Sequence, residues 1–110
     1  MGREFTEMDI RIFNKLAPEL NGNFMSNAGH PYPFILRPIS HKVVESSEDF
    51  RERLERLDAE ELDHIVQLAI EGKEDIRSLD EDDIDSIMEL VEEKLSTERL
   101  KEMKAALGFA

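Results

Sequence analysis

One short pattern recurs along the C-terminal half of the chain: an apolar residue, a capping residue, three mostly acidic positions and a second apolar residue. It reads LDAEEL at 57–62, LDEDDI at 79–84 and LSTERL at 95–100. The Asp or Ser accepts a hydrogen bond from a backbone N–H that the first helical turn leaves unpaired, and the two apolar residues pack together as a hydrophobic staple. Each copy predicts a helix start, so the stretch 57–107 predicts a helical array.

The first and second helix starts in this array, at 57–62 and 79–84, are similar beyond the pattern itself. A shift of 22 positions aligns Asp58 with Asp80, Glu61 with Asp83 and Leu62 with Ile84. A solenoid requires three or more full repeats, and only two are present with one further start signal. We therefore interpret the similarity between the two segments as shared helix-start chemistry, and the possibility of a true duplication stays open.

Apolar residues at helical spacing predict the remaining elements. FTEMDI at 5–10 repeats the start pattern and predicts a first helix over about 7–17 or 7–20, which Pro18 kinks or ends. Another helix is predicted to begin at Ser46–Ser47 with Arg51, Arg53 and Arg56 on its outer face. The last three helices are predicted at about 59–71, 81–95 and 97–107. We predict an all-α fold, a compact bundle of about five helices in a single domain over 1–110.

The connection at about 21–45 has a different character from the helical array at about 47–107. It is rich in turn-forming residues, and Pro31, Pro33 and Pro38 exclude a regular helix. The run 34–36 predicts a short extended segment or edge strand, and 41–44 predicts a second extended piece. A connection of this length either binds something or packs across the bundle to complete the core, and both interpretations stay open.

Charge is distributed unevenly along the chain. The formal net charge is −12, and residues 44–110 hold 22 of the 26 acidic residues but only nine of the 14 Lys and Arg residues. Such a field repels nucleic acid and attracts basic proteins or divalent ions, although it also serves simply to keep a helical surface soluble. We predict an acidic partner-binding surface made of Asp80, Glu81, Asp82, Asp83 and Asp85.

Motifs for catalysis and metal binding are weak. Cysteine is absent and the five glycines are scattered, which excludes thiol chemistry and glycine-rich phosphate loops. The run 80–85 fails as a calcium loop because Ile84 and Asp85 occupy the positions that require an oxygen ligand and a glycine. The three histidines match no metal-ligand spacing. We therefore predict no catalytic residue, no specific metal site and no cofactor, and allow only weak, non-selective cation binding.

These observations favour a non-catalytic module that binds a protein partner, itself basic, or that self-associates into a homo-oligomer. The alternative is a small-molecule or metal-dependent activity in the connection, and a weaker alternative is nucleic-acid mimicry toward a basic protein. The candidate binding residues in the connection are Asn23, Asn27, His30, Tyr32, Arg37 and His41. No apolar run is long enough to cross a bilayer and no signal-peptide core follows Met1, so we expect a cytoplasmic protein that binds neither membranes nor nucleic acid directly.

Overall fold

The computed structural model describes residues 6–20, 35–36 and 39–109, apart from the side chains at 20, 41 and 42. Its helices are α1 (Glu7–Leu16), α4 (Ser47–Leu54), α5 (Ala59–Ile70), α6 (Glu81–Lys94) and α7 (Thr97–Leu107). Short 3-10 helices lie at Pro18–Leu20 and Ile76–Ser78, and a π-helical turn lies at Ile39–Val43. The predicted all-α bundle of about five helices is confirmed, and the described residues include no strand.

Side-chain caps begin most of these helices, as the sequence pattern predicts. The capping residues that accept a hydrogen bond from the backbone N–H of the third helical residue are Thr6, Ser46, Asp58 and Ser96. Helix α6 is the exception, because the Asp80 side chain makes no cap hydrogen bond. The predicted cap at Asp80 is therefore wrong, although α6 begins where expected. Asp80 lies at the exposed surface.

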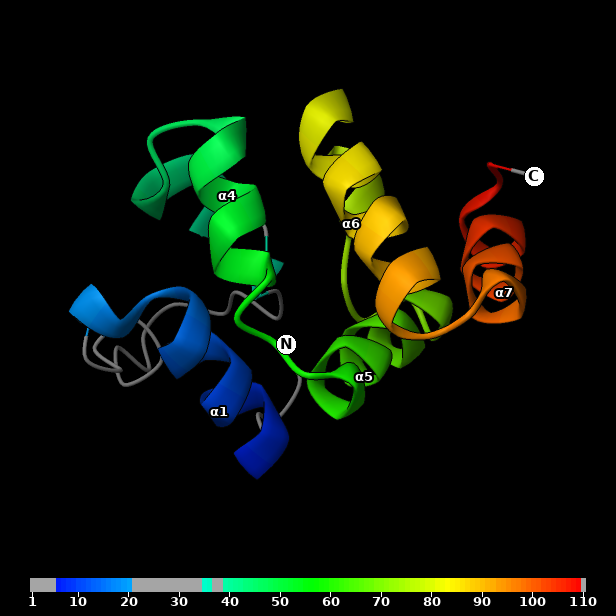
Figure 1. Cartoon of the computed structure of the whole chain (residues 1–110), viewed down its shortest axis with the longest axis horizontal. Coiled ribbons are helices and arrows are strands. Elements are labelled where there is room, and N and C mark those ends of the chain that lie inside the picture. Colours follow the sequence, from blue (N-terminus) through cyan, green and yellow to red (C-terminus); the bar gives the residue numbers. More distant parts are fainter. Residues whose placement is uncertain (1–5, 21–34, 37–38, 110) are drawn as a thin grey trace.

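The helices are arranged so that neighbours in space form a closed circuit (Figure 1). Helix α1 contacts α4 and α5, α4 contacts α6, and α7 contacts both α6 and α5. The circuit is closed by segments far apart in the sequence, since α1 packs on α5 and α4 packs on α6. The inward faces of all five helices can therefore bury their apolar stripes against one another.

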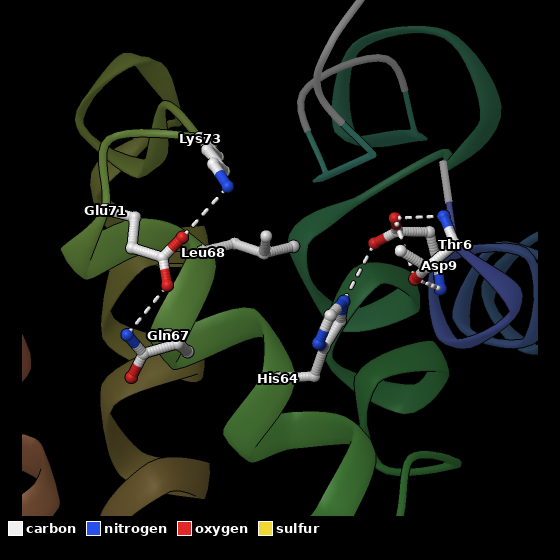
Figure 2. Close-up of a pocket in the computed structure, with 7 residues that line it drawn as sticks. All are labelled: Thr6, Asp9, His64, Gln67, Leu68, Glu71 and Lys73. Atoms are coloured by element: carbon white, nitrogen blue, oxygen red, sulfur yellow. Dashed lines mark hydrogen bonds and ion pairs between the residues drawn. The ribbon is translucent and has the colours of Figure 1, made fainter. Parts of the chain in front are cut away.

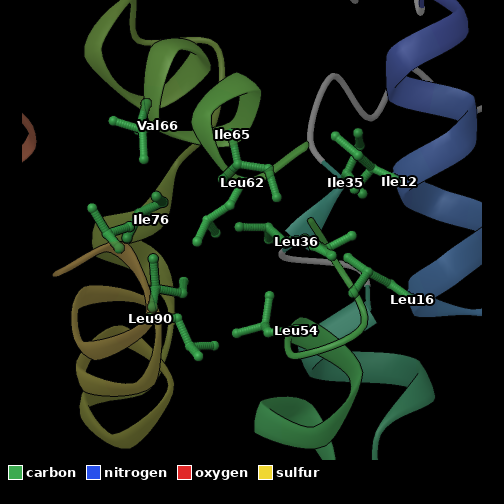
Figure 3. Packing of buried hydrophobic residues seen from close by; sticks show 14 of the residues in the cluster. Ile12, Leu16, Ile35, Leu36, Leu54, Leu62, Ile65, Val66, Ile76 and Leu90 are labelled. Atoms are coloured by element: carbon green, nitrogen blue, oxygen red, sulfur yellow. The ribbon is translucent and has the colours of Figure 1, made fainter. Parts of the chain in front are cut away.

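The core at the centre of this circuit also takes in part of the connection (Figure 3). Ile35, Leu36 and Ile39 are at most 1% exposed, like Ile12 of α1 and Leu62 of α5. The Ile35 backbone N–H donates to Glu74 Oε1 at 2.7 Å, so a buried carboxylate replaces the strand partner that an extended segment would need. For these residues, packing that completes the core is the observed role.

The extended segments predicted in the connection are corrected by the same observations. Ile35 forms a bend and Leu36 is helical, while residues 39–43 form the π-helical turn. Phe34, the first residue of the predicted segment 34–36, lies outside the described residues. The side chains are buried in the core. Backbone groups of these segments form hydrogen bonds to a side chain or within the turn, so no sheet is needed.

A buried arginine fastens α4 to the end of α1, although the sequence predicted Arg53 on the outer face of its helix. Arg53 is 9% exposed, and its Nη1 donates to the Leu16 carbonyl oxygen at 2.8 Å. Its two Nη atoms also bind both carboxylate oxygens of Glu19, at 2.9 and 2.7 Å. These hydrogen bonds lower the pKa of Glu19 from 4.5 to about 2. Arg53 is buried because its guanidinium group packs on the C-terminal end of α1 and donates to a carbonyl oxygen that the helix leaves unpaired.

Candidate functional site

The acidic residues predicted at the start of α6 do not all face solvent. Asp80, Glu81, Asp82 and Asp85 are exposed, whereas Asp83 is only 3% exposed. Asp83 lies one turn before the buried residue Ile87, so the helix directs it towards the bundle. The predicted acidic surface is corrected accordingly, and Asp83 belongs to the interior.

Beyond this first turn, the acidic face of α6 borders a groove shared with α7. The groove has a volume of about 260 Å³ and is lined by Asp85, Met88, Glu89, Glu92, Leu100 and Lys104. Met88 and Leu100 supply its apolar part, and both pack against the hydrophobic core. The three acidic residues are spaced four and three positions apart, which aligns them along one side of α6.

The electrostatics of this groove are strongly negative. Glu89 forms an ion pair with Arg51 of α4, and this hydrogen bond raises the pKa of Arg51 above its ordinary value. Within the described residues neither Asp85 nor Glu92 forms an ion pair. Lys104 is the basic residue that lines the groove. The groove thus combines apolar surface with two carboxylates, those of Asp85 and Glu92, that form no ion pair with a described residue.

A second pocket, of about 530 Å³, lies between the starts of α1 and the C-terminal part of α5 (Figure 2). It is lined by Thr6, Asp9, His64, Gln67, Leu68, Glu71 and Lys73. The Nε2 atom of His64 lies 2.9 Å from Asp9 Oδ1. The other Asp9 oxygen, Oδ2, accepts from the Thr6 backbone N–H at 2.7 Å and from its hydroxyl at 3.1 Å. Asp9 therefore serves both as the capping-box acid of α1 and as the link to α5.

A histidine hydrogen-bonded to a buried carboxylate is a common arrangement for a general base, which also requires a group from which it can take a proton. The hydroxyl that lines this pocket belongs to Thr6, which is engaged with Asp9 on both sides as donor and acceptor. Glu71 accepts from Gln67 at 2.8 Å and lies 3.1 Å from the Lys73 ammonium, and these bonds lower the pKa of Glu71. The polar groups of the wall are thus committed to one another, and we assign the Asp9–His64 contact to holding α1 on α5.

The binding residues predicted in the connection lie mostly beyond what the structure describes. Asn23, Asn27, His30, Tyr32 and Arg37 are outside the described residues. The backbone of His41 belongs to the π-helical turn Ile39–Val43, and its side chain is also outside the description. A binding role for this segment stays a prediction.

Sequence reasoning missed the groove, although one signal for it was present. The spacing of Asp85, Glu89 and Glu92 on a predicted helix already indicates one acidic edge. The neighbouring apolar residue Leu100 lies on another helix, and its position beside Met88 follows from how α7 packs on α6. No local pattern contains that information.

No protein-family model matches the chain, and neither does any curated protein or any solved structure. Within the described residues, no helix combines the length and apolar character that crossing a bilayer requires.

Proposed function

We propose that this chain is a non-catalytic interaction module that binds a basic segment of a protein partner in the groove between α6 and α7. The observation that carries the proposal is that the apolar residues Met88 and Leu100 lie beside the carboxylates of Asp85 and Glu92, which form no ion pair with any described residue. A matching segment presents an apolar side chain flanked by lysine or arginine. The apolar group supplies buried area, and the flanking cations supply orientation.

The net charge supports a basic partner over a second copy of this chain. Each chain carries −12, with residues 44–110 at −13 and residues 1–43 at +1, so two such faces repel each other when they meet. The same field attracts a basic protein from a distance and accelerates its association. Because exposed charges are screened within about 10 Å at 0.1 M salt, association should slow markedly as salt is added.

The apolar part of the groove also separates this proposal from nucleic-acid mimicry. A mimic imitates a row of phosphates, and charge alone suffices for that. Here the partly buried residue Met88 and an edge of the core residue Leu100 line the groove, so it offers apolar contacts beside the charges. A partner that uses both should retain part of its affinity at high salt, whereas attraction to charge alone should vanish.

The proposal is tested with a defined basic amphipathic peptide, in which leucines recur at helical spacing between lysines, titrated by fluorescence anisotropy at low and high salt. The double variant Asp85→Lys/Glu92→Lys should weaken binding at least about tenfold, or 1.4 kcal/mol. The matched control Glu52→Lys/Glu93→Lys changes the net charge equally at exposed acids outside the groove lining. It should weaken binding much less.

Equal losses in the two double variants would contradict the proposal, because they would mean that the peptide senses only the overall charge. Circular dichroism of each variant verifies that the helical fold is retained. Peptides in which leucine is replaced by serine provide the second control. At high salt, where the apolar contacts dominate, they should bind the wild-type chain more weakly than the leucine peptide does.

A further inference from the structure

Three helices of this fold place an acidic residue at their third position and bury it. Asp9 of α1 and Glu61 of α5 are 0% exposed, and Asp83 of α6 is 3% exposed. Asp9 contacts His64, and Glu61 contacts Arg11 and Lys15. Among the described residues, Asp83 has no such cationic group. Its partner is the Ser40 hydroxyl, which donates to Oδ2 at 2.6 Å, and its Oδ1 atom is buried without a hydrogen-bond partner.

Asp83 lines a pocket of about 180 Å³ where the π-helical turn, the start of α4 and the start of α6 meet. The pocket is lined by Ser40, Val44, Glu45, Ser46, Ser47, Asp80 and Asp83. Its side-chain polar groups are all carboxylates and hydroxyls. The Asp80 carboxylate is not used as a helix cap, and no described residue bonds to it. Two aspartates, one of them buried, are therefore available to a ligand in the same pocket.

A buried carboxylate without a counter-charge is unfavourable, and it is relieved by a proton or by a bound cation. The lining favours a cation of a particular kind. Oxygen donors without histidine or cysteine select hard cations, and Mg²⁺ is commonly held by one or two carboxylates while it keeps several waters. No three His, Cys, Asp or Glu side chains of the described residues are grouped so that they could hold a metal ion, so a bound cation would have to keep several of its waters.

We propose that this pocket binds a hydrated divalent cation, Mg²⁺ or Ca²⁺, with Asp83 Oδ1 as the principal ligand and Asp80 as the second. Ser40 holds the other oxygen of Asp83 and so positions the carboxylate. The site joins three segments that are separate in the sequence. Bound cation should therefore stabilise the packing of the π-helical turn and α4 against α6.

The test is a titration of the full chain with MgCl₂ and CaCl₂ by isothermal calorimetry, with NaCl maintaining constant ionic strength. Wild-type chain should bind one cation and show a rise in its thermal midpoint. Asp83→Asn preserves the shape and the Ser40 contact and should weaken binding more than about tenfold, the scale of loss seen even for groups that merely orient a metal ligand. Asp82→Asn, the exposed neighbour with the same loss of charge, should bind as the wild type does.

The outcomes are distinguishable. Loss of binding in Asp83→Asn alone supports the site. Equal weakening in both variants would overturn it, because the cation would then be held by the diffuse acidic surface. Absence of binding to the wild-type chain would overturn it too. Asp83→Asn removes a buried charge that has no cationic partner among the described residues, so metal-free Asp83→Asn should fold at least as stably as the wild-type chain, and the binding result remains interpretable.

Discussion

The starts of α5 and α6 share one sequence pattern, LDAEEL and LDEDDI, but are held in different ways. At α5, the Asp58 carboxylate accepts from the Glu61 backbone N–H at 2.8 Å, and Glu61 accepts from the Asp58 backbone N–H at 2.9 Å. Glu61 also binds Arg11 and Lys15 of α1, each at 2.7 Å. At α6, Asp80 makes no cap bond, and Asp83 has a serine hydroxyl as its hydrogen-bond partner.

The difference comes from what packs against each helix start. Helix α1 presents two basic side chains to the start of α5, whereas the π-helical turn presents Ser40 to the start of α6. A buried acid surrounded by cations stabilises the fold, while a buried acid without them is costly. The same local pattern therefore produces a structural anchor at one site and a candidate ligand site at the other.

The largest expected effect contrasts the apolar residues that follow the two starts. Leu62→Ala should lower the free energy of unfolding by about 2–5 kcal/mol, because the side chain is fully buried and its removal leaves a cavity. Ile84 at the equivalent position of α6 is only partly buried, so Ile84→Ala should cost clearly less. Urea titration monitored by circular dichroism measures both, and equal losses would show that the two starts are equally embedded.

The next contrast compares the two buried acids. Glu61→Gln should lower the free energy of unfolding by about 1.5 kcal/mol at neutral pH. This is near the low end for hydrogen bonds to charged groups, because Arg11 and Lys15 remain partly in solvent. Asp83→Asn, the matched change at α6, should lose nothing in the absence of metal. A similar loss in both variants would mean that Asp83 also has a stabilising counter-charge.

The pH dependence of stability sharpens the same contrast. Burial by itself raises the pKa of Glu61, but the hydrogen bonds from Lys15, the Asp58 backbone and Arg11 outweigh it and lower the pKa below 4.5. The stabilisation by Glu61 is therefore complete above pH 4.5 and is lost as pH falls through the lower pKa of the folded state. As pH falls below 4.5, the thermal midpoint of Glu61→Gln should decline less steeply than that of the wild-type chain. Parallel curves would contradict this assignment.

The smallest contrast concerns the caps. Asp58→Ala should lower the free energy of unfolding by about 0.5–2 kcal/mol, because it removes the acceptor for the Glu61 N–H. Asp80→Ala should change it by no more than about 0.5 kcal/mol, as expected for a surface group without a partner. The two variants are compared in one urea titration series. A loss at Asp80 as large as at Asp58 would show that Asp80 caps α6 in solution.

Local sequence chemistry was sufficient to predict most helix bounds. The caps at Thr6, Ser46, Asp58 and Ser96 all lie where the sequence pattern puts them. Each of these signals acts within one helical turn, so residues close in sequence contain all the information. The acidic character of the candidate groove was likewise visible in the spacing of Asp85, Glu89 and Glu92.

The sequence by itself determined the fold class, the helix starts and ends, and the negative charge of this protein, because propensity, capping and net charge are properties of short segments. Only the tertiary structure decided which acids have a cation beside them. Arg11 and Glu61 are 50 positions apart, and Ser40 and Asp83 are 43 apart. Such contacts depend on which helices become neighbours when the core closes. The burial of apolar faces determines which helices pack together. The polar side chains beside those faces then pair with the groups that this packing brings close to them.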